Sequence, residues 1–79
     1  MPPELRCELV AKPIAALVSA PDGKFGKIAK HSGGKFDLKR ATEQMQDAQA
    51  AECDRIPWSL VVRRCIVASK TNQDMISCM

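Results

Sequence analysis

The side chains best suited to chemistry are four cysteines and one histidine. No two cysteines form a Cys-x-x-Cys pair, and the gaps of 45, 11 and 12 residues between them match no familiar zinc pattern. An even number also allows disulfides in a secreted chain, but Glu4 and Glu8 stand where a signal peptide has basic residues. We therefore expect reduced, buried thiols, no metal, and a cytoplasmic or other reducing intracellular compartment. The five residues are Cys7, Cys53, Cys65, Cys78 and His31.

These residues give little support for a catalytic function. A nucleophilic Ser, Cys or Thr needs a neighbouring base and an orienting group. The one imidazole, His31, lies in a basic loop beside glycines, which is typical of an exposed residue. The segment Ser32-Gly33-Gly34-Lys35 lacks the Gly-x-x-x-x-Gly-Lys-Ser/Thr spacing of a phosphate-binding loop. The sequence therefore predicts a protein that is not an enzyme and that uses no cofactor and no small-molecule substrate.

Positive charge is concentrated in one segment. The net charge is +3, and residues 21–40 alone contribute +4. Lysines recur there at intervals of three and continue through a Ser-Gly-Gly loop. Such a cluster predicts contact with an anionic partner, and a nucleic acid bound with low sequence specificity is one hypothesis. The residues expected to make that contact are Lys24, Lys27, Lys30, Lys35, Lys39 and Arg40.

The most hydrophobic segment, residues 58–68, indicates a second kind of partner. A domain of 79 residues has a thin core, so self-association or docking into a complex would add stability. Trp58, Arg63 and Arg64 are residue types that are enriched at interface hot spots. The preferred hypothesis is a protein–protein interaction module (an inhibitor, adaptor or small subunit), with nucleic-acid binding as the alternative. No apolar run approaches the roughly 18 residues of a membrane span, so no membrane partner is expected.

A turn between two short segments predicts a β-hairpin. The segment Ala20-Pro21-Asp22-Gly23 has Pro, Asp and Gly in the order that a tight turn needs. The flanking segments, residues 14–20 and 24–31, have the length of strands. Gly26 is interpreted as a bulge that resets the register of the second strand.

The segment before the hairpin fits two templates. Alternation of apolar and polar side chains over residues 5–11 favours a half-buried strand. A helix is the alternative, but Pro13 would interrupt it at a cost of roughly 3 kcal/mol. We expect the strand, with Pro13 as a bend. The residues that would share one face of the alternative helix are Cys7, Val10, Ile14 and Leu17.

The local chemistry of residues 36–55 favours an α-helix. Strong helix formers fill the segment, which has no Gly, no Pro and one β-branched residue, Thr42. Asp37 is the expected N-cap, and Pro57 sets the end, so the helix should span about 37–54. Its predicted apolar seam consists of Leu38, Ala41, Met45, Ala48 and Glu52.

Residues 58–68 are predicted as a second helix rather than a strand. A strand would turn either Arg63 or Arg64 toward the packed side, whereas a helix places both outside the apolar arc. The predicted fold is therefore α+β: one domain over residues 1–79, with an N-terminal hairpin packed on the central helix and a second C-terminal helix. The alternative is a β-β-α-β order with residues 58–68 as a strand. Residues 1–3 and 70–79 are expected to be the flexible ends.

Overall fold

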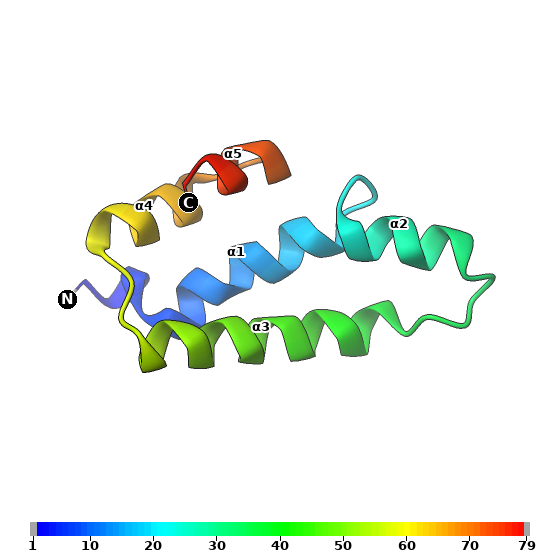
Figure 1. Ribbon diagram of the computed structural model, residues 1–79, viewed down its shortest axis with the longest axis horizontal. Coiled ribbons are helices and arrows are strands. Elements are labelled where there is room, and N and C mark those ends of the chain that lie inside the picture. Colours follow the sequence, from blue (N-terminus) through cyan, green and yellow to red (C-terminus); the bar gives the residue numbers. More distant parts are fainter. Residues whose placement is uncertain (1, 79) are drawn as a thin grey trace.

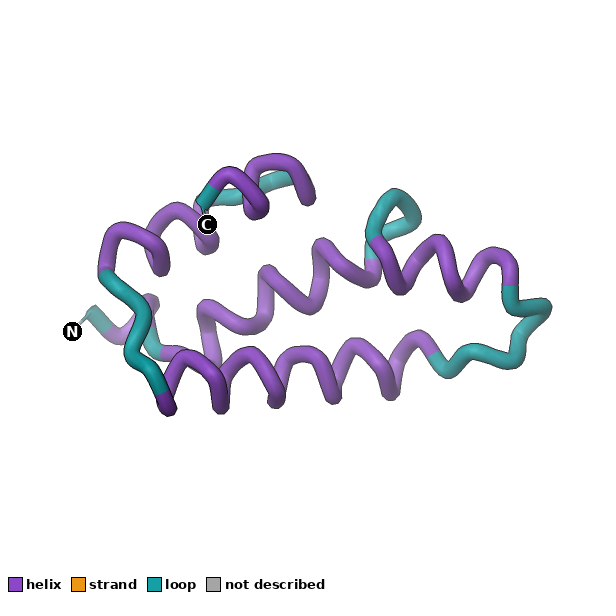
Figure 2. Tube along the Cα trace, in the orientation of Figure 1, coloured by secondary structure: helices purple, strands orange, loops and turns teal. Residues whose placement is uncertain are grey.

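The chain folds into helices only. The computed structural model describes residues 2–78, and this part of the chain contains no strand. The predicted α+β fold, its hairpin and its β-β-α-β alternative are therefore wrong. The helices form an elongated molecule of 42 × 22 × 18 Å (Figure 1), and Figure 2 shows that loops alone connect them.

The first long helix, α1, spans Cys7–Ser19 and replaces the two strands expected there. A short 3-10 turn, η1 (Pro3–Leu5), precedes it. The helix includes Pro13, which removes one intrahelical hydrogen bond at a cost of roughly 3 kcal/mol. Burial of Val10 and Ile14 contributes about 1.5–3 kcal/mol for each side chain, so together they offset the cost of Pro13. Val10 and Ile14 belong to the face of the alternative helix, and in the structure this face is buried.

The second helix, α2, spans Lys24–His31, where the second arm of the hairpin was expected. The Pro-Asp-Gly turn does form, and the Gly23 amide donates to the Ala20 carbonyl at 2.8 Å, but the turn joins two helices. Gly26 is helical rather than bulged. A Cβ atom at Gly26 would lie 1.8 Å from the Ala20 carbonyl oxygen. Glycine is needed here because the backbone of α2 closes directly on the end of α1.

The central helix, α3, spans Leu38–Arg55 and confirms the prediction. The Asp37 carboxylate caps it by accepting from the Arg40 amide at 3.0 Å, and the helix ends before Pro57 as expected. Helices α1 and α3 lie antiparallel side by side (Figure 1).

The face that α3 turns toward α1 matches the predicted apolar seam only in its first half, where Leu38, Ala41 and Met45 are half-buried. Thr42 lies on it, and its hydroxyl hydrogen-bonds the Ser19 hydroxyl of α1. Cys53 is completely buried, whereas Ala48 and Glu52 of the predicted seam are exposed. The buried cysteine and this polar contact set the rotation of α3, and an apolar pattern alone does not report either.

Two short helices complete the fold. Helix α4 spans Leu60–Ala68 and confirms the predicted second helix, although Ser59 caps it and it begins later than residue 58. Helix α5, Asn72–Ser77, forms within the tail expected to be flexible, and the side-chain Nδ2 of Asn72 donates to the Leu17 carbonyl at 2.8 Å. Residues 1 and 79, at the outer ends of the two segments expected to be flexible, lie outside the described residues.

The core is small and lies where α1, α4 and α5 meet. It consists of Val10 and Ile14 of α1 with Ile66 of α4 and Met75 of α5. Among residues 2–78, no helix is long and apolar enough to cross a membrane.

Two disulfides link the helices, which overturns the expectation of reduced thiols. Cys7 at the start of α1 pairs with Cys53 near the end of α3, with a Cα–Cα distance of 5.6 Å. Cys65 of α4 pairs with Cys78 after α5 at 5.7 Å. Both distances fall within the usual range for a disulfide. Such pairs are not typical of a reducing cytoplasm. The pairing could not be seen in the sequence because it depends on which helix ends meet.

Candidate binding surfaces

The six cations predicted to contact an anionic partner gather at one end of the molecule. We call this set the basic end. Helix α2, the loop after it and the first turn of α3 supply them, and these elements lie at the right of Figure 1. All six side chains are exposed. The basic end consists of Lys24, Lys27, Lys30, Lys35, Lys39 and Arg40.

Charge in the chain is strongly segregated. Residues 24–40 contain six Lys or Arg and one acid, Asp37, which gives +5. The whole chain has a net charge of +3, so the remaining residues have a net charge of −2. An exposed cluster of one sign produces a local positive potential that attracts anions.

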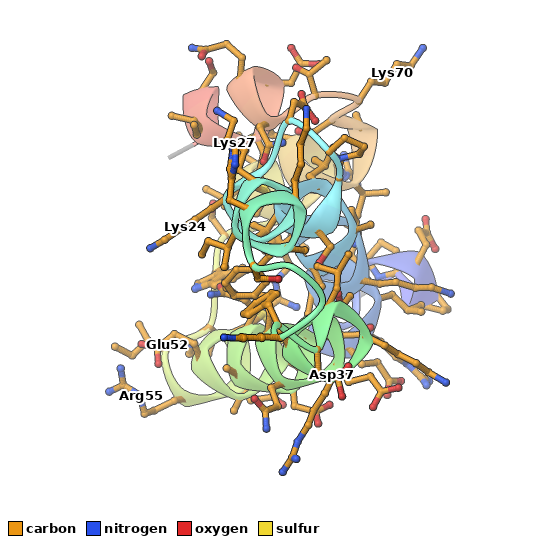
Figure 3. All side chains as sticks on the ribbon, turned by 90° about the vertical axis from the view of Figure 1, so that its right-hand side faces the viewer. Lys24, Lys27, Asp37, Glu52, Arg55 and Lys70 are labelled. Atoms are coloured by element: carbon orange, nitrogen blue, oxygen red, sulfur yellow. A yellow bond between two sulfur atoms is a disulfide. The ribbon has the colours of Figure 1, made fainter. Side chains whose placement is uncertain are left out.

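Helix α2 positions three of the lysines. Because an α-helix has 3.6 residues per turn, side chains three positions apart are rotated by about 60°. Lys24, Lys27 and Lys30 therefore lie within one sector of the helix surface. Figure 3 views the molecule from the basic end, and in this view Lys24 and Lys27 extend to the same side. The cluster predicted on a hairpin is thus placed on a helix.

Local contacts hold the loop at the basic end. The rings of Phe25 in α2 and Phe36 before α3 meet edge to face, with centroids 5.8 Å apart. The Ser32 hydroxyl donates to the Ala29 carbonyl at 2.9 Å and accepts from the Phe36 amide at 3.2 Å. Gly33 has a positive φ of 64°, which suits glycine in this turn.

An apolar side chain lies among these cations. Ile28 of α2 is 42% exposed. It lines a shallow hollow of about 450 Å³ together with Lys27, His31 and Ser32. His31 is exposed there, as the sequence predicted for a loop residue, although it is the last residue of α2.

The opposite end of the molecule exposes a different kind of surface. Three large apolar side chains of α4 face solvent, and Val61 is 79% exposed. Leu60 and Val67 share this surface with Arg64, because they lie three or four positions from it along the helix. We call Leu60, Val61, Arg64 and Val67 the α4 outer face. Of these, only Arg64 was predicted from the sequence to contact a protein partner.

The structure separates the three residues predicted to contact a protein partner. Arg64 is exposed on the α4 outer face. Trp58 is half-buried and packs against the core, and it lines a hollow of about 370 Å³ with Val62 and Cys78. Arg63 is only 3% exposed, whereas the sequence placed it outside the apolar arc.

The guanidinium of Arg63 joins three parts of the chain. Its Nε donates to the Trp58 carbonyl at 2.8 Å, and its Nη1 donates to the Leu5 carbonyl at 2.9 Å. These bonds satisfy backbone carbonyls of the η1 turn and of the segment before α4, and they satisfy donors that are costly to bury unbonded. Arg63 is therefore a structural residue. No simple spacing rule distinguishes it from Arg64.

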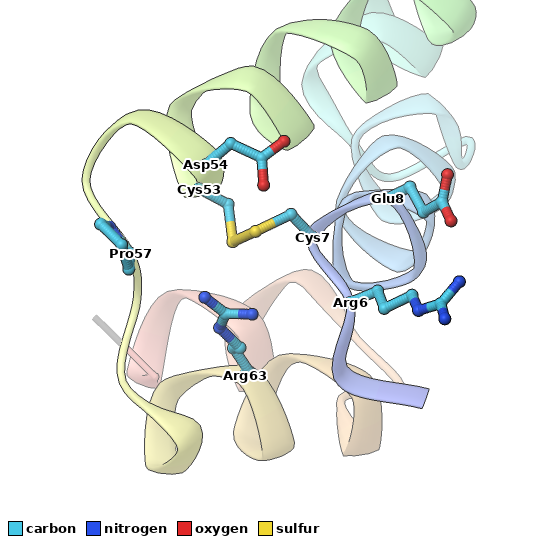
Figure 4. Close-up of a pocket in the computed structure, with 7 residues that line it drawn as sticks. All are labelled: Arg6, Cys7, Glu8, Cys53, Asp54, Pro57 and Arg63. Atoms are coloured by element: carbon cyan, nitrogen blue, oxygen red, sulfur yellow. A yellow bond between two sulfur atoms is a disulfide. The ribbon is translucent and has the colours of Figure 1, made fainter. Parts of the chain in front are cut away.

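A hollow of about 450 Å³ lies beside the Cys7–Cys53 disulfide (Figure 4). Both sulfurs are bonded, so neither provides a thiolate nucleophile. Over the described residues, no group of three or more His, Cys, Asp or Glu side chains could hold a metal ion. The hollow is lined by Arg6, Cys7, Glu8, Cys53, Asp54, Pro57 and Arg63.

Comparison of the chain with protein-family models, with curated proteins and with solved structures finds no match. Any functional assignment therefore depends on the surfaces described above.

Proposed function

We propose that this chain is a non-enzymatic binding protein that holds a polyanionic partner at its basic end. The observation that supports this most strongly is the charge segregation: +5 over residues 24–40 against −2 over the rest. All six cations are exposed. A polyanion that contacts several of these side chains releases condensed counterions, so binding should weaken steeply as salt increases.

The fold also supports a binding role for the basic end. Helix α2 is packed in place by the close contact at Gly26 and by the Phe25–Phe36 ring pair. Its lysines are therefore displayed before any partner arrives, which lowers the entropic cost of binding.

A salt titration with mixed-sequence DNA and RNA, and with anionic lipid vesicles, tests the proposal. We expect binding at low salt that falls as salt increases. The charge reversals Lys27→Glu and Lys30→Glu, made together, should abolish it. Lys12→Glu with Lys70→Glu is the matched control, because it makes the same charge change at exposed lysines outside the basic end. Failure to bind any polyanion at low salt would refute the proposal.

The α4 outer face supports a second candidate function, protein–protein interaction. The specific observation is the exposure of Leu60, Val61 and Val67 on one short helix. Sedimentation equilibrium over a range of concentrations tests the simplest case, self-association. Val61→Asp should then leave the protein monomeric without affecting its fold. A wild-type chain that stays monomeric throughout would exclude self-association through this face.

A further inference from the structure

We propose that the partner of the basic end is the surface of an anionic phospholipid bilayer, with Ile28 entering the interface beside Lys24 and Lys27. The proposal rests on the proposed function, because it names the partner of that same site.

The combination of charges with an exposed apolar side chain points to a lipid surface. Lys27 and Ile28 line the same hollow, and Ile28 is 42% exposed. Lysine stems can extend along such a surface while their ammonium groups reach the lipid phosphates. Each lysine near an anionic leaflet strengthens binding by about fivefold. An exposed apolar side chain beside these lysines gains nothing from a phosphate backbone, but it gains from entering the interfacial region of a bilayer.

The aromatic side chains of the basic end are poorly placed to bind nucleic acid. Single-stranded nucleic acids gain much of their affinity by stacking bases on free aromatic faces. Phe25 and Phe36 pack against each other, and both are half-buried. The loop between them has glycines at positions 33 and 34, which provide no side chain for contact with base edges. The lysines still attract phosphate groups, and the phosphates of a lipid surface are attracted equally.

Docking through the basic end determines the orientation of the molecule relative to the bilayer. Helix α3 has 18 residues, so it is about 27 Å long at 1.5 Å per residue. It begins at the basic end and ends at the segment that contains Trp58 (Figure 1). Trp58, the single tryptophan, should therefore remain away from the lipid. The sequence predicted no membrane partner because no apolar run is long enough to span a bilayer. A surface contact departs from that prediction, but it requires no spanning helix.

Vesicle sedimentation tests the proposal. We expect the protein to bind phosphatidylcholine vesicles that contain phosphatidylserine and not vesicles of phosphatidylcholine alone. Lys27→Glu with Lys30→Glu should weaken binding by more than about a hundredfold. The control pair Lys12→Glu with Lys70→Glu should weaken it far less. Equal binding to both kinds of vesicle, or loss of equal size in both charge-reversal pairs, would overturn the proposal.

Substitution of Ile28 separates insertion from simple charge attraction. Ile28→Ser should weaken vesicle binding by roughly fivefold, whereas Val61→Ser, at the other end, should leave it unchanged. Equal effects of the two substitutions would overturn the role of Ile28. Circular dichroism and thermal unfolding of each variant confirm that the fold is intact.

Tryptophan fluorescence tests the orientation. With brominated phosphatidylserine vesicles, a tryptophan introduced as Ile28→Trp in a Trp58→Phe background should be quenched, and Trp58 of the wild type should not. Quenching of Trp58 alone would overturn the proposal. Binding to DNA or RNA without binding to phosphatidylserine vesicles would overturn the lipid inference but leave the proposed function standing. Binding to neither would refute both.

Discussion

The two ends of this molecule are stabilised by different means. At one end, α1, α3, α4 and α5 are joined by both disulfides, by the Arg63 hydrogen bonds and by the apolar core. At the other end, α2 is held by the close approach at Gly26, by one ring pair and by loop hydrogen bonds, with no disulfide. The disulfide-linked end contains most of the buried contacts, and the basic end contains the segregated charge.

The contrast predicts that the stability of the fold and the proposed binding of a polyanion can be changed independently. Substitutions at the disulfide-linked end should lower the free energy of unfolding and leave the affinity of the folded protein for a polyanion intact. Charge substitutions at the basic end should have the reverse effect. Each prediction below tests this separation, beginning with the largest expected effect.

The largest effect is expected from the Cys7–Cys53 disulfide. It joins residues 46 positions apart, and a loop of that size corresponds to about 4 kcal/mol of stabilisation through the unfolded state. Cys7→Ala with Cys53→Ala should lower the free energy of unfolding, measured by urea denaturation, by that amount. Cys65→Ala with Cys78→Ala, which opens a loop of 13 positions, should cost less, about 3 kcal/mol. An unchanged urea midpoint in the first variant would contradict the stabilising role of the disulfide.

The adjacent arginines provide the next test. Arg63→Ala removes the hydrogen bonds to the Trp58 and Leu5 carbonyls and leaves a cavity, so the free energy of unfolding should fall by about 3 kcal/mol. Arg64→Ala, the exposed neighbour, should change it by less than about 0.5 kcal/mol. If thermal unfolding shows that the two variants lose the same amount of stability, Arg63 does not link these segments as described.

A smaller loss is expected when the close approach of α2 to α1 is disturbed. Gly26→Ala puts a Cβ atom against the Ala20 carbonyl, so one of the two helices must shift. Overpacking costs about 1–3 kcal/mol, and the helix propensity of alanine recovers nearly 1 kcal/mol. The net loss of stability in urea unfolding should be about 0–2 kcal/mol. A more stable variant would show that α2 does not close on α1 in this way.

The smallest change in stability is expected from the charge reversal that should abolish binding. Lys27 and Lys30 are exposed and have no ion-pair partner among residues 2–78. Lys27→Glu with Lys30→Glu should therefore change the free energy of unfolding by less than about 0.5 kcal/mol per site. A large drop in the melting temperature would contradict the separation of the two ends.

Local chemistry in the sequence predicted some elements and not others. Helix α3 was predicted because propensity, cap and stop signal agree within the segment itself. The hairpin was wrong because a Pro-Asp-Gly turn also joins helices, and Gly26 permits a close helix approach as readily as a bulge. Helix α1 was missed because the burial that offsets the cost of Pro13 depends on α4 and α5, which no local pattern includes.

The candidate surfaces were predicted unevenly for the same reason. The cations of the basic end are neighbours in sequence, so their clustering holds for a hairpin and for a helix alike. The pairing of the cysteines and the burial of Arg63 depend on contacts between distant segments, and both were missed. The sequence did contain a signal for the α4 outer face. Because Leu60, Val61 and Val67 are apolar, a helix over residues 60–68 has no side that is wholly polar.

Polyanion binding by two matched charge-reversal variants tests the central claim most directly. Fluorescence anisotropy or vesicle sedimentation at low salt would compare Lys27→Glu with Lys30→Glu against Lys12→Glu with Lys70→Glu. We predict that the first pair loses binding and that the second retains most of it, with both variants folded. Equal affinities in the two variants would show that the basic end is not where the partner binds.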